Sequence, residues 1–497
     1  MNANQYNGKI KNKALFEKLR CAAVGLEVKY DLATGERTRR IYLDSTASTL
    51  RLQVVQDVLD DYQPYYSNTH SVLHFGARLS TEEYRWAHQM VLDFVRADPH
   101  TYTCFFTGSG TTAAMNRVAR TLRERCPARD VVLTSIMEHH SNDLPHRKHF
   151  RDVVHVPAAM AARSLGCVDL ERMEQAFKEH EGRVNYVAIT GVSNVTGIIN
   201  PIHEVAEMAH RHGALMVVDA AQMAAHVPIR TSGHENPAHN LDVLVFSGHK
   251  IYAPGSPGVV VTRKDLFAEI EPQEVGGGMV DTVWVNRYTI SPKFPDREEA
   301  GTPNICGAIG LAAALYALHK VGMETVAEEE ERLIEYALQR LGKVPDLLIY
   351  GETDSKFCRR TGAISFNLKN FDHALTAAVL NDYFNISVRN ECFCAHPYVR
   401  EMVTLSLSEE AEKLSDEELA NLAELHRGMV RASFGIYNTE KDVEALVAAL
   451  HDISGKRAHY QKLYERLPNG EYEHRNFKFE HARLFSVKGE VDKWMEA

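Results

Sequence analysis

Over roughly the first 300 residues, short hydrophobic runs typical of strands alternate with stretches in which hydrophobic residues recur at helical spacing. Short runs rich in β-branched and aromatic residues predict strands at 103–107, 131–135, 184–192, 215–219, 243–247 and 258–262. Between these runs, apolar residues recur at helical spacing over 111–126, 170–179 and 202–212. Strands that alternate with helices are typical of a mostly parallel sheet covered on both faces, so we predict an α/β domain here.

The pattern changes after about residue 300. An Ala-, Leu- and Glu-rich stretch predicts one long helix over roughly 307–341, with strands to follow near 347–350, 363–367 and 386–389. This order predicts a second, smaller α+β domain. We place an N-terminal segment that packs with the small domain at 1–40, the large domain at 41–300, the small domain at 301–455 and a C-terminal extension at 456–497.

The sequence pattern does not decide the function of two segments in the C-terminal part. An acidic amphipathic helix is predicted over 409–427, within an insertion near 399–430, and the extension after residue 456 is charged and aromatic without clear periodicity. Each is either a solvated or packing segment or a site where a partner docks.

Composition and charge indicate a globular protein and argue against a nucleic-acid-binding, secreted or membrane protein. The chain has 497 residues, of which 44% are hydrophobic and 25% charged, which is typical of a globular protein large enough for two or more domains. Its net charge is −10 and it contains no basic run, so nucleic acid is excluded as a partner. The N-terminus lacks the apolar core of a signal peptide, and no stretch approaches ~20 apolar residues, so we expect a cytoplasmic protein without a membrane partner.

A Gly-rich turn follows the first predicted strand, at Gly108-Ser109-Gly110, and a helix begins near Thr111. Glycines let the backbone approach an anion, the first helical turn presents free N–H groups, and Thr111 and Thr112 add hydroxyl donors. An ordinary helix cap has the same pattern, so the turn alone does not establish a phosphate site.

Two further strands end on ionisable residues. Asp219 ends the strand at 215–219, and Lys250 follows the strand at 243–247, next to Ser247 and His249. Ligands bind beyond the carboxyl ends of parallel strands, although a single Asp at such an end is also a common cap or turn former. Together the three strand ends supply a phosphate cup, a carboxylate and an amine, which are the groups that pyridoxal phosphate requires.

The order of several motifs makes a family resemblance explicit. They are IYLDSTAST at 41–49, MEHHSN at 137–142, VSNVTG at 192–197, VDAAQ at 218–222, FSGHK at 246–250, GGGM at 276–279, EAGTPN at 299–304 and RASFGIYNT at 431–439. Over roughly residues 40–450 the chain resembles class V (fold type I) pyridoxal-phosphate enzymes, and among them the group II cysteine desulfurases and selenocysteine lyases. The resemblance implies a mostly parallel seven-stranded sheet in the large domain, and a homodimer.

The resemblance also implies the roles of individual residues. Lys250 would hold the cofactor as a Schiff base, Asp219 would pair with the ring nitrogen, and His139 would stack on the ring and move protons. Asn194 and Gln222 would tune the 3-oxygen and the pyridine face. The phosphate would be held by Gly110, Thr111, Thr112, Ser247 and His249, with Thr302 reaching the phosphate of the other subunit. Arg431 would clamp the substrate carboxylate through a bidentate fork, with Asn194 and Arg389 as further substrate contacts.

The loop at 389–397 decides the reaction. In the desulfurases this loop carries the thiol that takes sulfur from L-cysteine, leaving alanine and a persulfide, and Cys394 matches it. The family's glycine and histidines are replaced here by Glu391, Cys392 and Phe393, and Ser71 stands where the family has an arginine after an Asn-x-His. The Glu391 carboxylate opposes thiol activation.

Several alternatives therefore remain open. The eight cysteines lack the spacing of a zinc site or a disulfide scaffold, and most are expected to be buried and inert. Cys392 and Cys394 are also consistent with packing residues or with a pair that exchanges a persulfide for a disulfide, whereas a metal site would need further ligands.

Other class V reactions without a protein thiol are aminotransfer, epimerisation and carbon–sulfur or carbon–selenium β-elimination, and an inactive cofactor-binding scaffold is a last possibility. For a desulfurase, a sulfur-acceptor protein is a further candidate partner.

Overall fold

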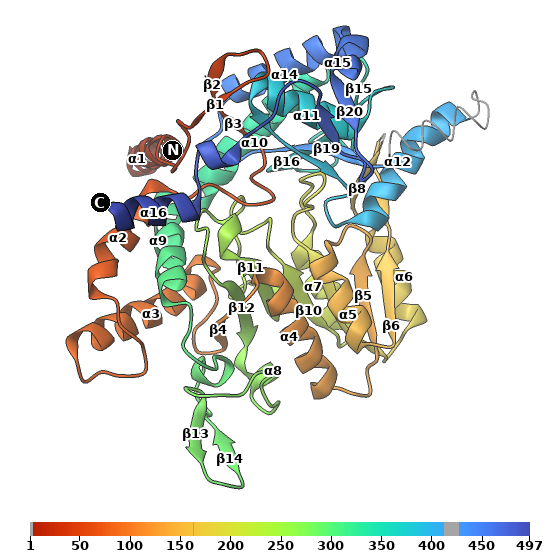
Figure 1. Ribbon diagram of the computed structural model, residues 1–497. Coiled ribbons are helices and arrows are strands. Elements are labelled where there is room, and N and C mark those ends of the chain that lie inside the picture. Colours follow the sequence, from red (N-terminus) through yellow and green to blue (C-terminus); the bar gives the residue numbers. More distant parts are fainter. Residues whose placement is uncertain (1–2, 163, 412–426) are drawn as a thin grey trace.

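The computed structural model describes residues 3–162, 164–411 and 427–497, and it contains two sheets that each have their own hydrophobic core (Figure 1). The larger sheet has seven strands in the order β4-β12-β11-β10-β9-β5-β6. Their bounds are β4 Tyr102–Thr107, β5 Val131–Ser135, β6 Asp152–Val156, β9 Val184–Thr190, β10 Leu215–Asp219, β11 Val243–Ser247 and β12 Gly258–Arg263. Only β12 runs antiparallel to its neighbours in this sheet, so the predicted mostly parallel seven-stranded sheet is confirmed.

Helices cover both faces of the larger sheet. Successive side chains of its strands point to opposite faces, and both faces are buried. On β10, Val217 joins the core beneath α4 (Gly110–Arg125) and α8 (Lys264–Phe267), whereas Met216 and Val218 join the core on the other face. That other core includes residues of α3 (Phe75–Phe94), α6 (Leu170–Glu179), α7 (Ile202–Arg211) and α9 (Ile305–Val321). The two-sided burial explains the continuous apolar runs of the sequence.

The smaller sheet has four strands in the order β15-β16-β19-β18. They are β15 Leu347–Ile349, β16 Ala363–Leu368, β18 Arg389–Glu391 and β19 Met429–Ser433, with α10 Met323–Leu341, α11 His373–Phe384, α14 Glu440–Gly455 and α15 Arg457–Leu463 around them. The predicted single helix over 307–341 is wrong. Gly322, at φ +87°, ends α9 and begins α10, and the two helices are bent by 81°.

The remaining elements frame these two sheets. They are α1 Ala3–Arg20, β1 Lys29–Asp31, β2 Arg37–Arg39, β3 Ile41–Tyr42, α2 Gln53–Tyr62, α5 Leu144–His149, β7 Ala158–Met160, β8 Leu165–Val168, β13 Val280–Val283, β14 Tyr288–Ile290, β17 Ile386–Ser387, α12 His396–Ala411, β20 Tyr464–Arg466, β21 Tyr472–His474 and α16 Val487–Glu496. The N-terminal helix α1 packs against α9 and α10, and β3 pairs with β17 beside the smaller sheet. The β13–β14 hairpin projects from the bottom of the view in Figure 1.

Two further observations concern the sequence predictions. Most of the acidic helix predicted over 409–427 lies outside the described residues. In the described ranges, no single helix is long and apolar enough to cross a membrane, and α9 with α10 meets that length and composition only as a bent pair. Much of α9 is buried in the core of the larger sheet.

Candidate active site

A cavity of about 500 Å³ lies at the carboxyl ends of the parallel strands, where the loops after β4, β5, β9, β10 and β11 converge. It is lined by Ala47, Gly108, Ser109, Gly110, Thr111, Thr112, His139, Ser141, Thr190, Asn194, Asp219, Ala221, Gln222, Ser247, His249, Lys250 and Ser256. All ten residues predicted to hold the cofactor from within one chain therefore line one pocket. Its volume lies in the range of small-molecule sites, and its position follows the rule for open α/β sheets.

The N-terminus of α4 forms one wall of this pocket. Gly110 has φ +56°, and a Cβ at this position would lie 2.6 Å from Ser247 Oγ, so only glycine fits without displacing the serine. Ser247 Oγ in turn accepts a hydrogen bond from the Thr111 backbone N–H and contacts the Thr111 hydroxyl, both at 2.8 Å. The helix terminus, its N–H groups and these hydroxyls together make a polar cradle for a phosphate.

Opposite charges meet deeper in the pocket. Asp219 is only 3% exposed, and its Oδ1 accepts a hydrogen bond from Ala221 N at 2.9 Å. Burial raises the pKa of Asp219, and Lys250 opposes that shift. Burial lowers the pKa of Lys250 to about 8, opposed by Asp219 and reinforced by the charge of Arg431. Near neutral pH, Lys250 therefore has a far larger fraction of free amine than a surface lysine.

Two histidines and an amide line the same cavity. The Ser141 N–H donates to His139 Nδ1 at 3.1 Å, so the neutral ring carries its proton on Nε2. Burial, with Lys250 adding to it, lowers the pKa of His139 to about 3 and that of His249 to about 4, so both rings are neutral at physiological pH. Gln222 Nε2 donates to the carbonyl of Thr46 at 2.8 Å, which fixes its side chain.

Arg431 extends from β19 of the smaller sheet to the segment that carries Asn194. Its Nη1 donates to the carbonyl of Asn194 at 2.9 Å, and its Nη2 lies 3.4 Å from Asp44 Oδ1. The side chain is buried, which lowers the pKa of Arg431 to about 10, and its Nε has no hydrogen-bond partner in the described structure. Arg389 lies 3.9 Å from the other oxygen of Asp44, so Asp44 pairs with both arginines.

The loop that carries Cys394 is held at the pocket through its backbone. Asn194 Nδ2 donates to the carbonyl of Phe393 at 2.8 Å, and the His140 N–H donates to the carbonyl of Cys394 at 2.7 Å. The guanidinium of Arg431 lies 4.6 Å from the centre of the Phe393 ring. Cys394 itself is exposed, and in its thiolate form it is one of the charges that raise the pKa values of Lys250 and Arg431.

Left-handed backbone conformations at three residues distinguish this loop from a regular turn. Glu391, Phe393 and Cys394 have φ values of +93°, +50° and +56°, which are left-handed conformations that favour glycine. Cys392 is half-buried, and its thiol donates to the carbonyl of Arg427 at 3.4 Å. Burial and the Glu391 carboxylate raise the pKa of Cys392. Cys394 is therefore the more accessible thiol of the two.

One predicted cofactor contact lies apart from the pocket, and two residues were missed. Thr302 is exposed, accepts a hydrogen bond from Asn68 at 3.4 Å and does not line the cavity. Asp44 and Glu138 received no role from the sequence, although they lie in the motifs at 41–49 and 137–142. Glu138 accepts hydrogen bonds from Ser135 and from Asn142, and burial raises its pKa to about 8.

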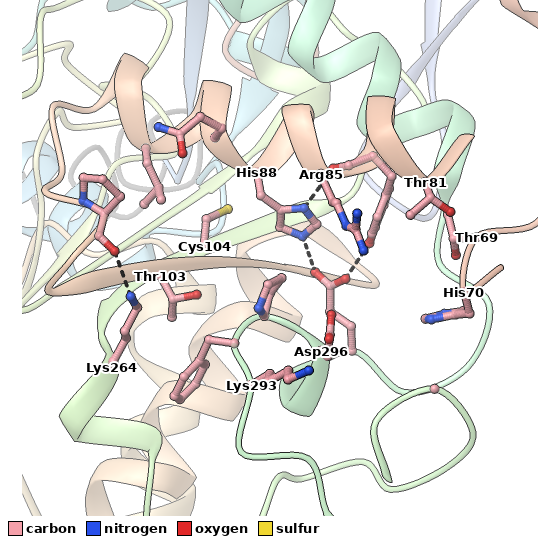
Figure 2. Close-up of a pocket in the computed structure, with 18 of the residues that line it drawn as sticks. Thr69, His70, Thr81, Arg85, His88, Thr103, Cys104, Lys264, Lys293 and Asp296 are labelled. Atoms are coloured by element: carbon pink, nitrogen blue, oxygen red, sulfur yellow. Dashed lines mark hydrogen bonds and ion pairs between the residues drawn. The ribbon is translucent and has the colours of Figure 1, made fainter. Parts of the chain in front are cut away.

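A larger cavity, of about 850 Å³, lies on another part of the molecule and is shown in Figure 2. Its central carboxylate, Glu299, already binds His88 Nε2 at 2.8 Å and the Tyr84 hydroxyl at 2.6 Å. Lys264 donates to backbone carbonyls at its edge. Because these polar groups satisfy one another, we place the active site at the smaller cavity, where Lys250 and Asp219 face open space.

The smaller cavity fits pyridoxal phosphate on three structural grounds. Gly110 and the start of α4 form a cradle from which a side chain is excluded. A buried carboxylate, Asp219, would pair with a protonated ring nitrogen. The amine of Lys250, whose pKa desolvation lowers to about 8, has a substantial free fraction near neutral pH, which suits attachment of an aldehyde.

Comparisons with known proteins agree with this geometry. The family model for aminotransferase class-V matches residues 41–446. A probable cysteine desulfurase of Halalkalibacterium halodurans is 34% identical over 82% of this chain and 92% of its own length, and a cysteine desulfurase of Shigella flexneri is 34% identical over 83% and 93%. The apo structure of a cysteine desulfurase from Thermococcus onnurineus superposes with a TM-score of 0.70 at 28% identity, covering 84% of this chain and 95% of that one. The chain therefore belongs to the class V aminotransferase family of pyridoxal-phosphate enzymes.

Proposed function

We propose that this protein is a cysteine desulfurase, which converts L-cysteine to L-alanine and transfers the sulfur to Cys394 as a persulfide. The observation that carries the proposal is the position of the Cys394 loop. Its backbone is tied to Asn194 and to His140 at the mouth of the pocket that contains Lys250, while the thiol remains exposed. The similarity to cysteine desulfurases over most of the chain supports the same reaction.

Arg431 is proposed to bind the substrate carboxylate. Its guanidinium is buried beside the pocket, and its Nε is left without a partner among the described residues. The contact between Nη2 and Asp44 is long, at 3.4 Å. A carboxylate would satisfy both donors, because a planar fork matches carboxylate geometry, and it would thereby fix the orientation of the amino acid.

Lys250 is proposed to move the substrate proton. Pyridoxal phosphate, when bound, supplies an electron sink that makes the substrate Cα–H acidic and weakens the bond between Cβ and sulfur. With its pKa lowered to about 8 by burial, Lys250 Nζ is suited to accept a proton from Cα and to return one to the alanine product. His139, neutral and held through Nδ1, would present its Nε2–H to the same space.

Cys394 is proposed to accept the sulfur. Its thiolate attacks the substrate sulfur, a new S–S bond forms, and the Cβ–S bond breaks with its electron pair left on the carbon that becomes the alanine methyl group. One L-cysteine and one enzyme thiol thus give one L-alanine and one enzyme persulfide, without an external oxidant or reductant. The persulfide sulfur then leaves to an acceptor thiol, which we propose is that of a partner protein.

A homodimer is part of the proposal. Thr302 is exposed and lies outside the pocket of its own chain, which suits a residue that contacts the phosphate in a second copy. The role of Thr302 is thus a prediction about the assembled enzyme.

Product analysis tests the proposed reaction. The holoenzyme with L-cysteine and a reducing thiol should release alanine and sulfide in equal amounts, and Cys394→Ser should lose at least about 1000-fold of this activity. Cys392→Ser is the matched control, because it removes the half-buried thiol two residues away, and it should retain activity. Pyruvate and ammonia as products, or full activity in Cys394→Ser, would establish a thiol-independent elimination instead.

A further inference from the structure

Two cysteines outside the active site lie close together. Cys167 belongs to β8, and Cys358 lies in the loop between β15 and β16 of the smaller sheet. Their sulfur atoms are 3.8 Å apart, with the Cys167 thiol as donor, and Cys167 Sγ also lies 3.3 Å from the carbonyl of Ile199. The two residues are 191 positions apart in sequence, so only the tertiary fold brings them together.

Backbone contacts hold the segment that follows Cys358. Ile198 forms a β-bridge with Arg360, and the Ile199 N–H donates to the carbonyl of Arg359 at 3.0 Å. Gly166, next to Cys167, leaves room for the other sulfur, because a Cβ there would lie 2.8 Å from Cys358 Sγ. The loop of Cys358 is therefore packed directly on β8. A disulfide requires the sulfurs to approach by about 2 Å more.

The two thiols differ in reactivity. The hydrogen bond from Cys167, with a smaller contribution from the charge of Arg360, lowers the pKa of Cys358. The same interaction, with burial, raises the pKa of Cys167. Cys358 is only 6% exposed, but it lines a cavity of about 430 Å³ together with Arg359 and Arg360, which offers a small reagent a route to it. A thiol of lowered pKa at the wall of a cavity, with a second thiol beside it, is the arrangement of a redox-sensitive pair.

We propose that Cys167 and Cys358 are an oxidation site, at which a hydroperoxide converts the two thiols to a reversible disulfide. The Cys358 thiolate attacks hydrogen peroxide, the O–O bond breaks, and a sulfenic acid and hydroxide form. The Cys167 sulfur then attacks Cys358 Sγ, and the sulfenic oxygen leaves as water with the Cys167 proton. Overall, two thiols and one peroxide give one disulfide and two waters. A dithiol reductant reverses the reaction.

The disulfide would join the β7–β8 hairpin, beside the larger sheet, to a loop of the smaller sheet. The pair does not line the cavity of Lys250, so the inference does not depend on the proposed desulfurase activity. Its position distinguishes it from Cys392 and Cys394, which share one loop.

Mass spectrometry of the full-length protein tests the inference. After treatment with one equivalent of hydrogen peroxide and alkylation of the remaining thiols, the protein should lose two hydrogens, and a digest should contain a peptide pair linked through Cys167 and Cys358. Dithiothreitol should reverse both changes. Cys358 oxidised without a link to Cys167, or a link confined to another pair such as Cys392 and Cys394, would overturn the proposal.

Variants assign the order of the two steps. Cys167→Ser should stop at a sulfenic acid on Cys358 that dimedone traps, whereas Cys358→Ser should leave Cys167 unoxidised. Cys126→Ser, which removes a partly exposed cysteine elsewhere, should form the disulfide as the parent chain does. A dimedone adduct on Cys167 in the Cys358→Ser variant would contradict the assigned roles. The experiment on the unmodified chain decides the proposal even if a variant does not fold.

Discussion

The cofactor pocket and the Cys394 loop (residues 389–397) hold their functional groups by different means. In the pocket, Asp219 and Ser247 end buried strands, and Gly110 begins a long helix, so regular structure positions each group. In the loop, Glu391 and Cys394 adopt left-handed backbone conformations, and hydrogen bonds from other segments hold the chain in place. The pocket thus has the more rigid support, whereas the loop carries the residues that depart from the family pattern.

This difference separates two questions about the enzyme. The pocket sets the cofactor, which is common to all class V enzymes, and its residues match the family motifs. In the proposed reaction the loop sets the fate of the substrate sulfur, and three of its residues differ from the family. Changes at Asp219 and Lys250 test the pocket, a change at Arg431 tests the residue between pocket and loop, and a change at Glu391 tests the loop backbone.

Asp219→Asn should impair the pocket and leave the loop intact, and among these four tests it has the largest expected effect. Loss of the buried charge removes the partner of a protonated ring nitrogen, so alanine formation should fall by about 100- to 1000-fold. Alkylation of Cys394 by iodoacetamide should proceed at the parent rate. Activity within a few-fold of the parent enzyme would show that Asp219 does not supply this charge.

Arg431→Lys tests the residue that lies between the two regions. Lysine keeps the positive charge but loses the bidentate fork and the contact with the Phe393 ring. We expect kcat/KM for L-cysteine to fall by about 10- to 100-fold, mainly through KM. Arg400→Lys, an exposed arginine on α12, is the control and should have no effect. Equal kinetics for Arg431→Lys and the parent enzyme would contradict a carboxylate clamp.

The pH dependence of Lys250 reports on the pocket alone. Because burial destabilises its charged form, the free amine should increase about fivefold between pH 7 and pH 8. Amidination of the cofactor-free protein by methyl acetimidate, measured on the Lys250 peptide, should follow this curve. A midpoint near the ordinary lysine value would mean that the amine is not desolvated.

Glu391→Gly should relieve the backbone of the loop, and this is the smallest expected effect. At φ +93° a glycine avoids the strain of a side chain, so the free energy of unfolding should rise by about 1 kcal/mol. Urea denaturation measures the change. Glu391→Ala, which removes the carboxylate but keeps a Cβ, should give no such gain, and an equal gain in both variants would assign the effect to charge instead of backbone.

The sequence predicted the pocket better than the loop because strand ends leave a clear periodic signal. The strands at 131–135, 215–219 and 243–247 have the predicted bounds, and they position Asp219 and Lys250. The break of the long helix at Gly322 was missed because apolar spacing continues across it. Asp44 was missed because its partner Arg431 is 387 positions away, a pairing that no local pattern encodes.

The most direct test of the account is to locate the sulfur after reaction. The holoenzyme is mixed with L-cysteine in the absence of a reducing thiol, quenched with an alkylating agent, digested and analysed by mass spectrometry. The account predicts one additional sulfur atom on Cys394 and one alanine for each modified chain. Alanine formed without added sulfur on Cys394, or sulfur first on Cys392, would contradict it.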